Sequence, residues 1–317
     1  MTHQPDPTAR DRVRRAVAAT AMILLGIAAA GCGGDGEPAI ERGDRLWADS
    51  SYRAALAEYR LALEQESGSD EVLARVAHAY LRTGEFERGK EAYDRLIERD
   101  SAYADQAVFD YMTVARQAYE RSDRYGMAIA VDAASALRSG LPLDDMAAPL
   151  ARYYATSGAP ERAIEYYERA LGAAPADSVA TLLFELGEVL EAIGGCEEAL
   201  GFFEAYRDRA PNGVHADQAR WQTGSCSFIL ARRARQAGDL EAALRHSETV
   251  IDLGVPQNVQ DQAWFEHGET LLALGRHDEA LTSFRMVLEV SRTRSGQLVD
   301  RAQRRIDELR FGDLEAR

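Results

Sequence analysis

The chain has 317 residues, of which 46% are hydrophobic and only 9 are proline, a composition that favours a folded helical protein. Its formal net charge is −15 at pH 7, so its surface repels phosphate backbones and anionic headgroups, and nucleic acid is excluded as an expected partner. The length suffices for one large core or for a solenoid of stacked repeats.

Residues 1–31 predict a cleaved export signal. Four arginines precede an uncharged run from Ala16 to Gly31. The apolar part of that run is about fifteen residues long, shorter than the roughly twenty that a membrane-spanning helix needs, and it ends in small residues. The pair Arg14-Arg15 is a feature of twin-arginine signals, but its flanking residues differ from that motif, so the sequence favours the general secretory route.

A cysteine directly follows the small residues Ala29-Ala30-Gly31. This order resembles the bacterial lipoprotein signal, in which diacylglycerol is attached to the cysteine thiol and the chain is cut just before it. The resemblance implies lipidation of Cys32, although the family usually has Leu where this chain has Ala29. Gly33, in place of the Asp that retains lipoproteins at the inner membrane, implies the outer membrane, facing the periplasm. The alternatives are a secreted protein with a free Cys32 and an uncleaved anchor.

Residues 32–38 would form a lipidated tether. Each buried methylene contributes about 0.8 kcal/mol, so the three acyl chains of a mature lipoprotein would hold it firmly. Residues 33–38 reach roughly 20 Å at about 3.4 Å per residue, which would keep the folded body near the lipid. Removal of residues 1–31, with four Arg and two Asp, leaves 33 basic and 50 acidic residues and a net charge of −17.

A repeated unit begins at residue 36 and recurs about every 34 residues. The first unit carries Gly43, Leu46, Tyr52, Ala55, Tyr59 and Ala62, and the second carries Ala77, Tyr80, Phe86, Gly89, Tyr93 and Leu96 at the same positions. Later units carry Ala151, Tyr154, Ala163, Tyr167, Ala170 and Pro175, then Leu183, Leu186, Gly187, Leu190, Ala199, Phe203 and Pro211, then Trp264, Gly268, Leu271, Ala280 and Phe284. The pattern resembles the tetratricopeptide repeat, although His267 replaces a usual Leu.

This resemblance implies an all-α fold, a right-handed α-α superhelical solenoid of about seven helix pairs over residues 39–311. Small residues let the two helices of a pair approach closely, and large residues fill the space around them. Neither helix can bury its apolar stripe alone, so each pair is expected to stack on its neighbours.

Two units are longer than the others. The tripeptide Asp-Gln-Ala opens a first helix at Asp105, Asp217 and Asp261, and the small residue of the second helix follows at Ala128, Ala243 and Ala280. The first two intervals exceed the third by four and by seven positions, spacings that return to the same helical face. We therefore predict first helices that are longer by about one and two turns; the alternative is a longer loop between the two helices.

The end of the chain predicts a cap. Leu298, Ala302, Ile306 and Leu309 recur at helical spacing within residues 297–311, which indicates a helix that covers the last repeat. Residues 312–317 are expected to be a charged, solvated tail.

Two cysteines remain besides Cys32. An oxidising compartment would permit a disulfide between Cys196 and Cys226, and closing a loop of about thirty residues would stabilise the fold by roughly 3 to 4 kcal/mol. The alternative is two separate buried thiols.

Motifs for catalysis are missing from the sequence. It contains no zinc-protease helix, Cys-x-x-Cys pair, phosphate loop or nucleotide fingerprint. Gly224-Ser225-Cys226-Ser227, with His215 and His246 as the nearest histidines, is expected to be core packing within a helix. We predict no enzyme, no metal site, no small-molecule substrate, and no cofactor apart from the covalent lipid on Cys32.

The family resemblance implies a concave groove lined by positions 2, 5, 9 and 12 of each first helix. The candidate residues at these positions are Asp44, Trp47, Ala74, His78, Arg152, Phe184, Glu188, Glu191, Phe265 and Glu269. Aromatic and acidic side chains together would suit an extended or helical peptide with basic character. For Trp47 and Phe265 the alternative is packing between repeats.

These features together predict a lipid-anchored scaffold that binds another protein or peptide of the cell envelope. It is similar to the helical-repeat lipoproteins of outer-membrane β-barrel assembly and to periplasmic repeat proteins that coordinate the cell wall with envelope constriction. The alternatives are a soluble periplasmic adaptor without lipid and a cell-wall-acting enzyme, for which no stretch outside the repeats is long enough.

Overall fold

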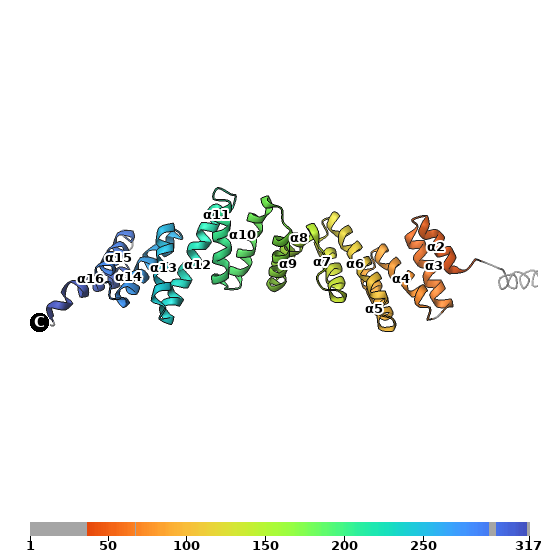
Figure 1. Ribbon diagram of the computed structural model, residues 1–317, viewed down its shortest axis with the longest axis horizontal. Helices are drawn as coiled ribbons and strands as arrows, with labels where there is room; N and C mark the ends of the chain where they lie inside the picture. Colours follow the sequence, from red (N-terminus) through yellow and green to blue (C-terminus); the bar gives the residue numbers. More distant parts are fainter. Residues whose placement is uncertain (1–36, 67, 292–295, 316–317) are drawn as a thin grey trace, which may run out of the picture. The chain divides into compact units, whose positions relative to one another are not determined.

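The computed structural model describes residues 37–66, 68–291 and 296–315, with side chains described as far as Phe311. The described residues divide into two compact units, unit 1 up to Tyr111 and unit 2 from Met112 onward. The described residues form α-helices and two short 3-10 helices, without strands (Figure 1). The predicted export signal, Cys32 and most of the tether lie outside the described residues.

Unit 1 contains two helix pairs and the beginning of a third. The helices are α2 (Ala39–Ala48), α3 (Tyr52–Gln65), α4 (Asp70–Thr83), α5 (Phe86–Arg99) and the first half of α6 (Tyr103–Glu120). Gly43 of α2 lies against the ring of Tyr59, and a Cβ atom at that position would be only 2.5 Å from Tyr59 Cε1. The small residue therefore allows the close approach of α2 and α3, as the repeat pattern predicts.

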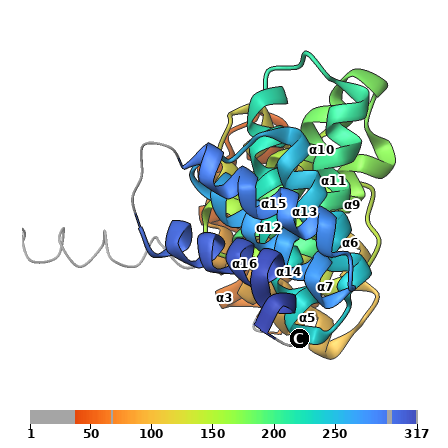
Figure 2. The ribbon, with the colours of Figure 1, turned by 90° about the vertical axis from the view of Figure 1, so that its left-hand side faces the viewer.

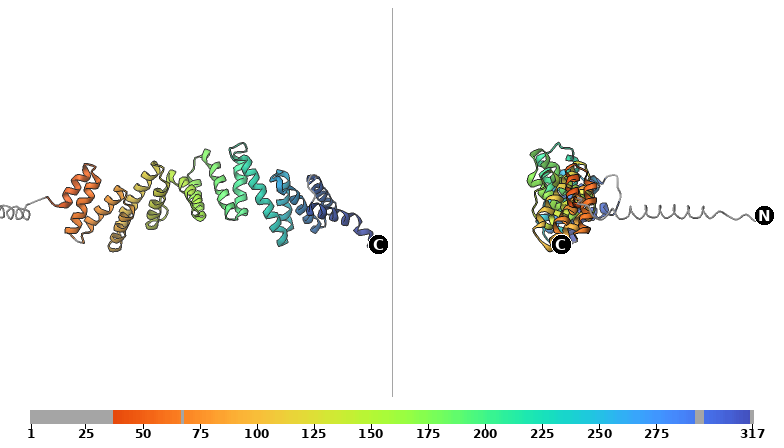
Figure 3. Two further views of the ribbon diagram at one scale, coloured as in Figure 1. Left: turned by 180° about the vertical axis from the view of Figure 1, so that it is seen from behind. Right: turned by 90° about the vertical axis from the view of Figure 1, so that its right-hand side faces the viewer.

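Unit 2 contains the rest of α6 and the remaining helices, in pairs that follow one another along the chain (Figure 3). They are α7 (Arg124–Leu137), η1 (Asp144–Met146), α8 (Ala147–Thr156), α9 (Pro160–Ala173), α10 (Ala176–Ala192), α11 (Cys196–Arg209), α12 (Ala216–Ala237), α13 (Leu240–Leu253), η2 (Gln257–Val259), α14 (Gln260–Ala273), α15 (His277–Val290) and α16 (Gln297–Glu315). The described part of the chain thus has the seven predicted pairs, α2/α3 to α14/α15, and a final helix. This confirms the all-α helical solenoid.

Local chemistry sets several helix ends. The side chain of Ser69 accepts a hydrogen bond from the backbone N–H of Val72 at the start of α4, and Asp239 accepts one from Ala242 at the start of α13. Gly84 directly follows α4 and Gly238 directly follows α12, and both have a left-handed backbone that glycine adopts without strain.

The two longer units owe their length to helix rather than to loop. Helix α6 has 18 residues and α12 has 22, whereas α4 and α14 have 14. This confirms the predicted extensions of the first helices, and the alternative of a longer loop between the helices is wrong. The segment that follows α13 crosses α12 at Gly224, where a Cβ atom would lie 2.0 Å from the carbonyl oxygen of Val255. The first two turns of α12 therefore extend past the end of α13.

The C-terminal helix packs beside α14 and α15 as a cap (Figure 2). Its residues Ala302 and Ile306 are buried in one cluster with Phe284 and Val287. The helix begins at Gln297 as predicted and continues to Glu315, so the first residues of the expected tail are helical.

Cys196 and Cys226 form a disulfide between α11 and α12, with their Cα atoms 5.1 Å apart. Of the two alternatives that the sequence left open, the structure therefore has the bridge. The bridge belongs to the buried cluster of Phe184, Phe203 and Tyr206 and joins two consecutive repeats.

No helix in the described part of the chain combines the length and the apolar character needed to cross a membrane.

Candidate functional site

The first helices of each unit form a surface that we call the first-helix wall. In unit 1 it is made by α2, α4 and the beginning of α6, and in unit 2 by α8, α10, α12 and α14. The wall of unit 1 contains a hollow of about 520 Å³, within the range of roughly 300–1,000 Å³ found for ligand pockets. Its lining includes Asp44, Trp47, Glu71, His78, Gln106 and Phe109.

Trp47 is half-buried at the edge of this hollow. Its ring centroid lies 4.8 Å from that of Tyr52 and 4.7 Å from that of His78, which belongs to the next repeat. Trp47 thus packs between repeats and also lines the hollow. The two alternatives for this residue, groove lining and packing, are therefore both true.

Asp44 and Arg75 join α2 to α4 inside the hollow. Asp44 accepts hydrogen bonds from Tyr59 Oη at 2.8 Å and from Arg75 Nε at 2.9 Å. Burial alone would raise the pKa of Asp44, but these hydrogen bonds outweigh it and hold the pKa below its ordinary value. Arg75 also pairs with Glu71 at 3.0 Å, so one guanidinium serves two carboxylates.

His78 and Asp110 join α4 to α6. His78 Nδ1 lies 2.6 Å from Asp110 Oδ2, and Tyr93 donates its hydroxyl hydrogen to the same oxygen. Burial, together with the nearby Asp110 carboxylate, raises the pKa of Tyr93 far above its ordinary value, so its phenol stays neutral. Because Asp110 is only 4% exposed, His78 is the reachable member of this pair.

The wall of unit 2 is crossed by polar contacts between consecutive repeats. They join Arg116 to Asp145, Arg152 to Glu185, Gln218 to Glu188, Arg235 to Glu266 and Arg305 to Glu269. Arg152, Glu188 and Glu269, which the sequence predicts as groove residues, therefore bind neighbours within the chain. Burial is the main cause that raises the pKa of Glu188, and it also raises that of Glu191, one turn further along α10.

Phe184 and Phe265 do not line a groove, contrary to the prediction for Phe184 and to one alternative for Phe265. They are 1% and 3% exposed. The ring of Phe184 stacks on His215, with centroids 4.3 Å apart. The guanidinium of Arg301 lies 4.3 Å from the ring centroid of Phe265. In both cases a residue later in the chain covers the aromatic ring.

The sequence interpretation missed Gln106 and Phe109 of α6. Phe109 is 69% exposed and lines the hollow in unit 1. A signal for it was present, because Asp105-Gln106-Ala107 matches Asp261-Gln262-Ala263, which places Phe109 at the same repeat position as Phe265.

Arg152 borders several hollows of unit 2, of which two exceed about 300 Å³. The larger, of about 680 Å³, is bordered mainly by alanine, proline and aspartate side chains between η1, α8 and α10. The smaller, of about 340 Å³, is bordered by Tyr167, Glu185 and Glu188. Neither contains tryptophan or phenylalanine in its lining, so the hollow of unit 1 is the better match to the predicted aromatic and acidic site.

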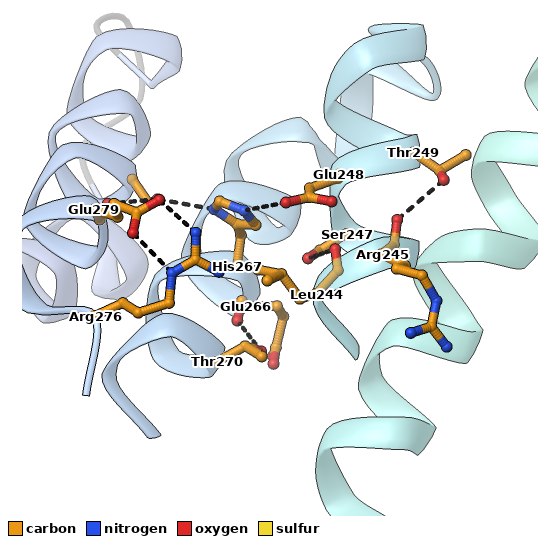
Figure 4. A network of polar contacts seen from close by, with 11 residues as sticks. Leu244, Arg245, Ser247, Glu248, Thr249, Glu266, His267, Thr270, Arg276 and Glu279 are labelled. Atoms are coloured by element: carbon orange, nitrogen blue, oxygen red, sulfur yellow. Dashed lines mark hydrogen bonds and ion pairs between the residues drawn. The ribbon is translucent and has the colours of Figure 1, made fainter. Parts of the chain in front are cut away.

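A histidine network joins α13, α14 and α15 (Figure 4). His267 Nδ1 lies 2.8 Å from Ser283 Oγ, and this hydroxyl donates to the carbonyl oxygen of Glu279 at 3.0 Å. Nε2 of the same ring faces the Glu248 carboxylate at 3.8 Å. Burial is the main cause that lowers the pKa of His267 below its ordinary value. The histidine thus fills, as a neutral ring, the place of the family's usual Leu.

The segment that resembled a nucleophile's setting is part of the core. Residues 224–227 lie inside α12, Cys226 is in the disulfide, and Ser227 is buried without a hydrogen-bond partner for its Oγ atom. Across the described ranges, no group of three or more His, Cys, Asp or Glu side chains is arranged to hold a metal ion.

This architecture of stacked helix pairs defines a helical-repeat protein. Models of the tetratricopeptide repeat match residues 70–103, 148–214 and 230–297, which together make up more than half of the chain, and neither model describes a catalytic family. The chain belongs to the tetratricopeptide-repeat family, as the residue pattern predicted.

Several solved structures are similar to this chain. The MamA protein is 19% identical, with 55% of this chain and 90% of that chain covered and a TM-score of 0.33. The C-terminal part of a TPR repeat-containing protein from Cytophaga hutchinsonii is 16% identical, with 82% and 98% covered and a TM-score of 0.34. YrrB, a TPR protein with an unusual peptide-binding site, is 21% identical, with 68% and 99% covered and a TM-score of 0.32. No curated protein matches the sequence.

Proposed function

We propose that this protein is a scaffold, anchored to the membrane of the bacterial cell envelope, that binds another envelope protein or peptide through its concave groove. The observation that carries the binding role is the hollow of unit 1. It offers a half-buried tryptophan, an exposed phenylalanine and the accessible carboxylates of Asp44 and Glu71 on two successive first helices. Tetratricopeptide repeats present such walls to extended or helical segments of other proteins.

The anchoring role rests on Cys32 and the signal before it. Helix α2 begins at Ala39, so six residues separate it from Cys32, a reach of roughly 20 Å at about 3.4 Å per residue. The disulfide between Cys196 and Cys226 supports the same compartment, because disulfides persist in oxidising surroundings such as the periplasm. The first repeat would then lie against the bilayer, with the groove starting at the membrane surface. Gly33 supports placement in the outer membrane, and a role in outer-membrane or cell-wall assembly would follow from that location.

Anchoring is tested by replacing Cys32 with Ser in cells. We expect loss of palmitate labelling and release of the protein from the membrane fraction. Unchanged labelling and fractionation would contradict the anchor. The intact mass of the mature wild-type protein separates this proposal from a soluble periplasmic adaptor, since acylation adds mass at Cys32.

Binding is tested by site-specific photo-crosslinking in cells. A photoreactive residue at position 106, inside the hollow, should give discrete crosslinks to envelope proteins. The same residue at position 98, on the exposed face of α5 in the same unit, is the matched control. Crosslinks that form only from position 98 would contradict a groove-binding scaffold.

A further inference from the structure

We infer that the hollow of unit 1 receives an arginine side chain from a segment of the partner protein. This inference deepens the proposed function, because it rests on the first-helix wall being the docking surface. It is argued from charge, from the aromatic rings of the hollow, and from an internal example in unit 2.

The charge of the hollow is complementary to a cation. The accessible carboxylates of Asp44 and Glu71 and the buried carboxylate of Asp110 line it, against the single guanidinium of Arg75 and the imidazole of His78. The side chains of Glu71 and Asp44 are 72% and 47% exposed, so they remain accessible although both contact Arg75. A carboxylate accepts up to four hydrogen bonds, so a second guanidinium can share these oxygens.

The aromatic rings suit a guanidinium better than an ammonium ion. A guanidinium is planar, stacks on aromatic faces and donates bidentately to carboxylates, whereas the ammonium of lysine is a compact and strongly hydrated charge. The surroundings of Trp47 already contain such a pair, since the guanidinium of Arg82 lies 4.6 Å from the ring centroid of Tyr52, which contacts Trp47.

In unit 2, the residue that corresponds to Phe109 in the repeat is buried beneath another side chain. Phe265 and Phe109 each stand four residues after the Asp of an Asp-Gln-Ala tripeptide. Phe265 is covered by Arg301 of α16, and Arg305, one turn further on, pairs with Glu269 at 2.7 Å. Phe109 is 69% exposed, compared with 3% for Phe265. The cap thus places two arginines on an aromatic and acidic surface of unit 2, which shows that a first-helix wall of this chain accommodates guanidinium groups.

The test uses the full-length protein in detergent micelles and three fluorescein-labelled peptides. Each peptide carries two copies of one residue, four positions apart as Arg301 and Arg305 are, in an otherwise uncharged sequence. That residue is arginine, lysine or citrulline, and citrulline keeps the shape of arginine without its charge. Fluorescence anisotropy should show binding of the arginine peptide, at least tenfold weaker binding of the citrulline peptide, and weaker binding of the lysine peptide than of the arginine peptide.

Variants locate the binding. Glu71→Gln and Trp47→Leu should each weaken binding of the arginine peptide by five- to tenfold, whereas Glu98→Gln, on α5 outside the hollow, should leave it unchanged. Glu71 is largely exposed, so Glu71→Gln keeps the fold and the test stays decisive even if Trp47→Leu perturbs packing. Equal binding of the arginine and citrulline peptides, equal binding of arginine and lysine, or unchanged binding by Glu71→Gln would overturn the inference.

The outcome is separable from that of the proposed function. If position 106 crosslinks to a partner in cells but the arginine peptide does not bind, the groove binds by other chemistry and only this inference fails. If position 106 yields no crosslinks and the arginine peptide does not bind either, the docking role of the wall fails with it.

Discussion

Phe109 in unit 1 and Phe265 in unit 2 occupy the same position of their repeats and have opposite environments. Phe109 is exposed beside the hollow, whereas Phe265 is buried under Arg301. Both walls are crossed by contacts between consecutive repeats, but the unit 1 wall keeps the ring of Phe109 and the carboxylates of Asp44 and Glu71 accessible. The repeat position of a residue therefore determines whether it lies on the first-helix wall. The element that follows in the chain determines whether that residue stays exposed and can contact a partner.

The sharpest test of this comparison is to truncate both phenylalanines. We expect Phe265→Ala to lower the free energy of unfolding of unit 2 by about 3–5 kcal/mol, because it leaves a cavity in a buried cluster. Phe109→Ala should change stability by no more than about 0.5 kcal/mol, as an exposed substitution does. Urea titration followed by circular dichroism measures the free energy of unfolding of both variants. Similar losses for the two variants would contradict the difference in environment between Phe109 and Phe265.

Removing the disulfide should weaken unit 2 in particular. Replacing Cys196 and Cys226 together by Ala releases a cross-link over a sequence separation of 30 residues, for which the chain-entropy model gives roughly 3–4 kcal/mol. The amides of α11 and α12 should then exchange with deuterium faster, while those of α2 to α5 are unchanged. Equal effects in both units would show that the bridge does not act locally.

His267 makes the stability of unit 2 sensitive to acid. Burial lowers its folded pKa below the ordinary value of about 6.5, so the unfolded chain binds the proton more readily. Stability should therefore be fully present above pH 6.5 and should fall as the pH drops from 6.5 through the lower folded pKa. In His267→Leu, which restores the family's usual residue, the acid loss of thermal stability should be smaller. An unchanged pH profile would contradict this assignment.

The smallest effect is expected from a single polar contact of the unit 2 wall. Glu269→Gln removes the ion pair with Arg305, in which the Glu269 side chain is 15% and the Arg305 side chain 41% exposed, so we expect a loss of about 1 kcal/mol, the upper end for surface pairs. The matched change Glu308→Gln alters another carboxylate that pairs with Arg305 but leaves the link between α14 and α16 intact. A loss above about 2 kcal/mol for Glu269→Gln exceeds the range of such surface pairs and would mean that the wall depends on individual pairs rather than on packing.

Much of the fold was predictable because the repeat pattern is local. The spacing of small and aromatic residues predicted the seven helix pairs, and the extra four and seven residues before Ala128 and Ala243 predicted the long first helices. Helical spacing within residues 297–311 predicted the cap. These features depend on residues close together in the chain, whose periodicity is visible without knowledge of their neighbours in space.

The candidate site was less predictable because exposure depends on more distant residues. His215 precedes α12 and covers Phe184, and Arg301 of the capping helix covers Phe265, although neither covering residue belongs to the repeat that it affects. Phe109 was not predicted as a site residue, because the greater length of α6 obscured its register in the repeat.

The sequence by itself determined the repeat family, the number of helix pairs, the lengthened first helices and the existence of a cap. It also supplies the basis for the proposed anchor at Cys32. Only the tertiary structure decided that Cys196 and Cys226 are joined, that Arg152, Glu188 and Glu269 contact neighbouring repeats, and that the accessible aromatic hollow lies in unit 1. The physical reason is that periodicity reports which face of a helix is apolar, whereas the accessible surface of that face depends on the side chains that the next repeat places on it.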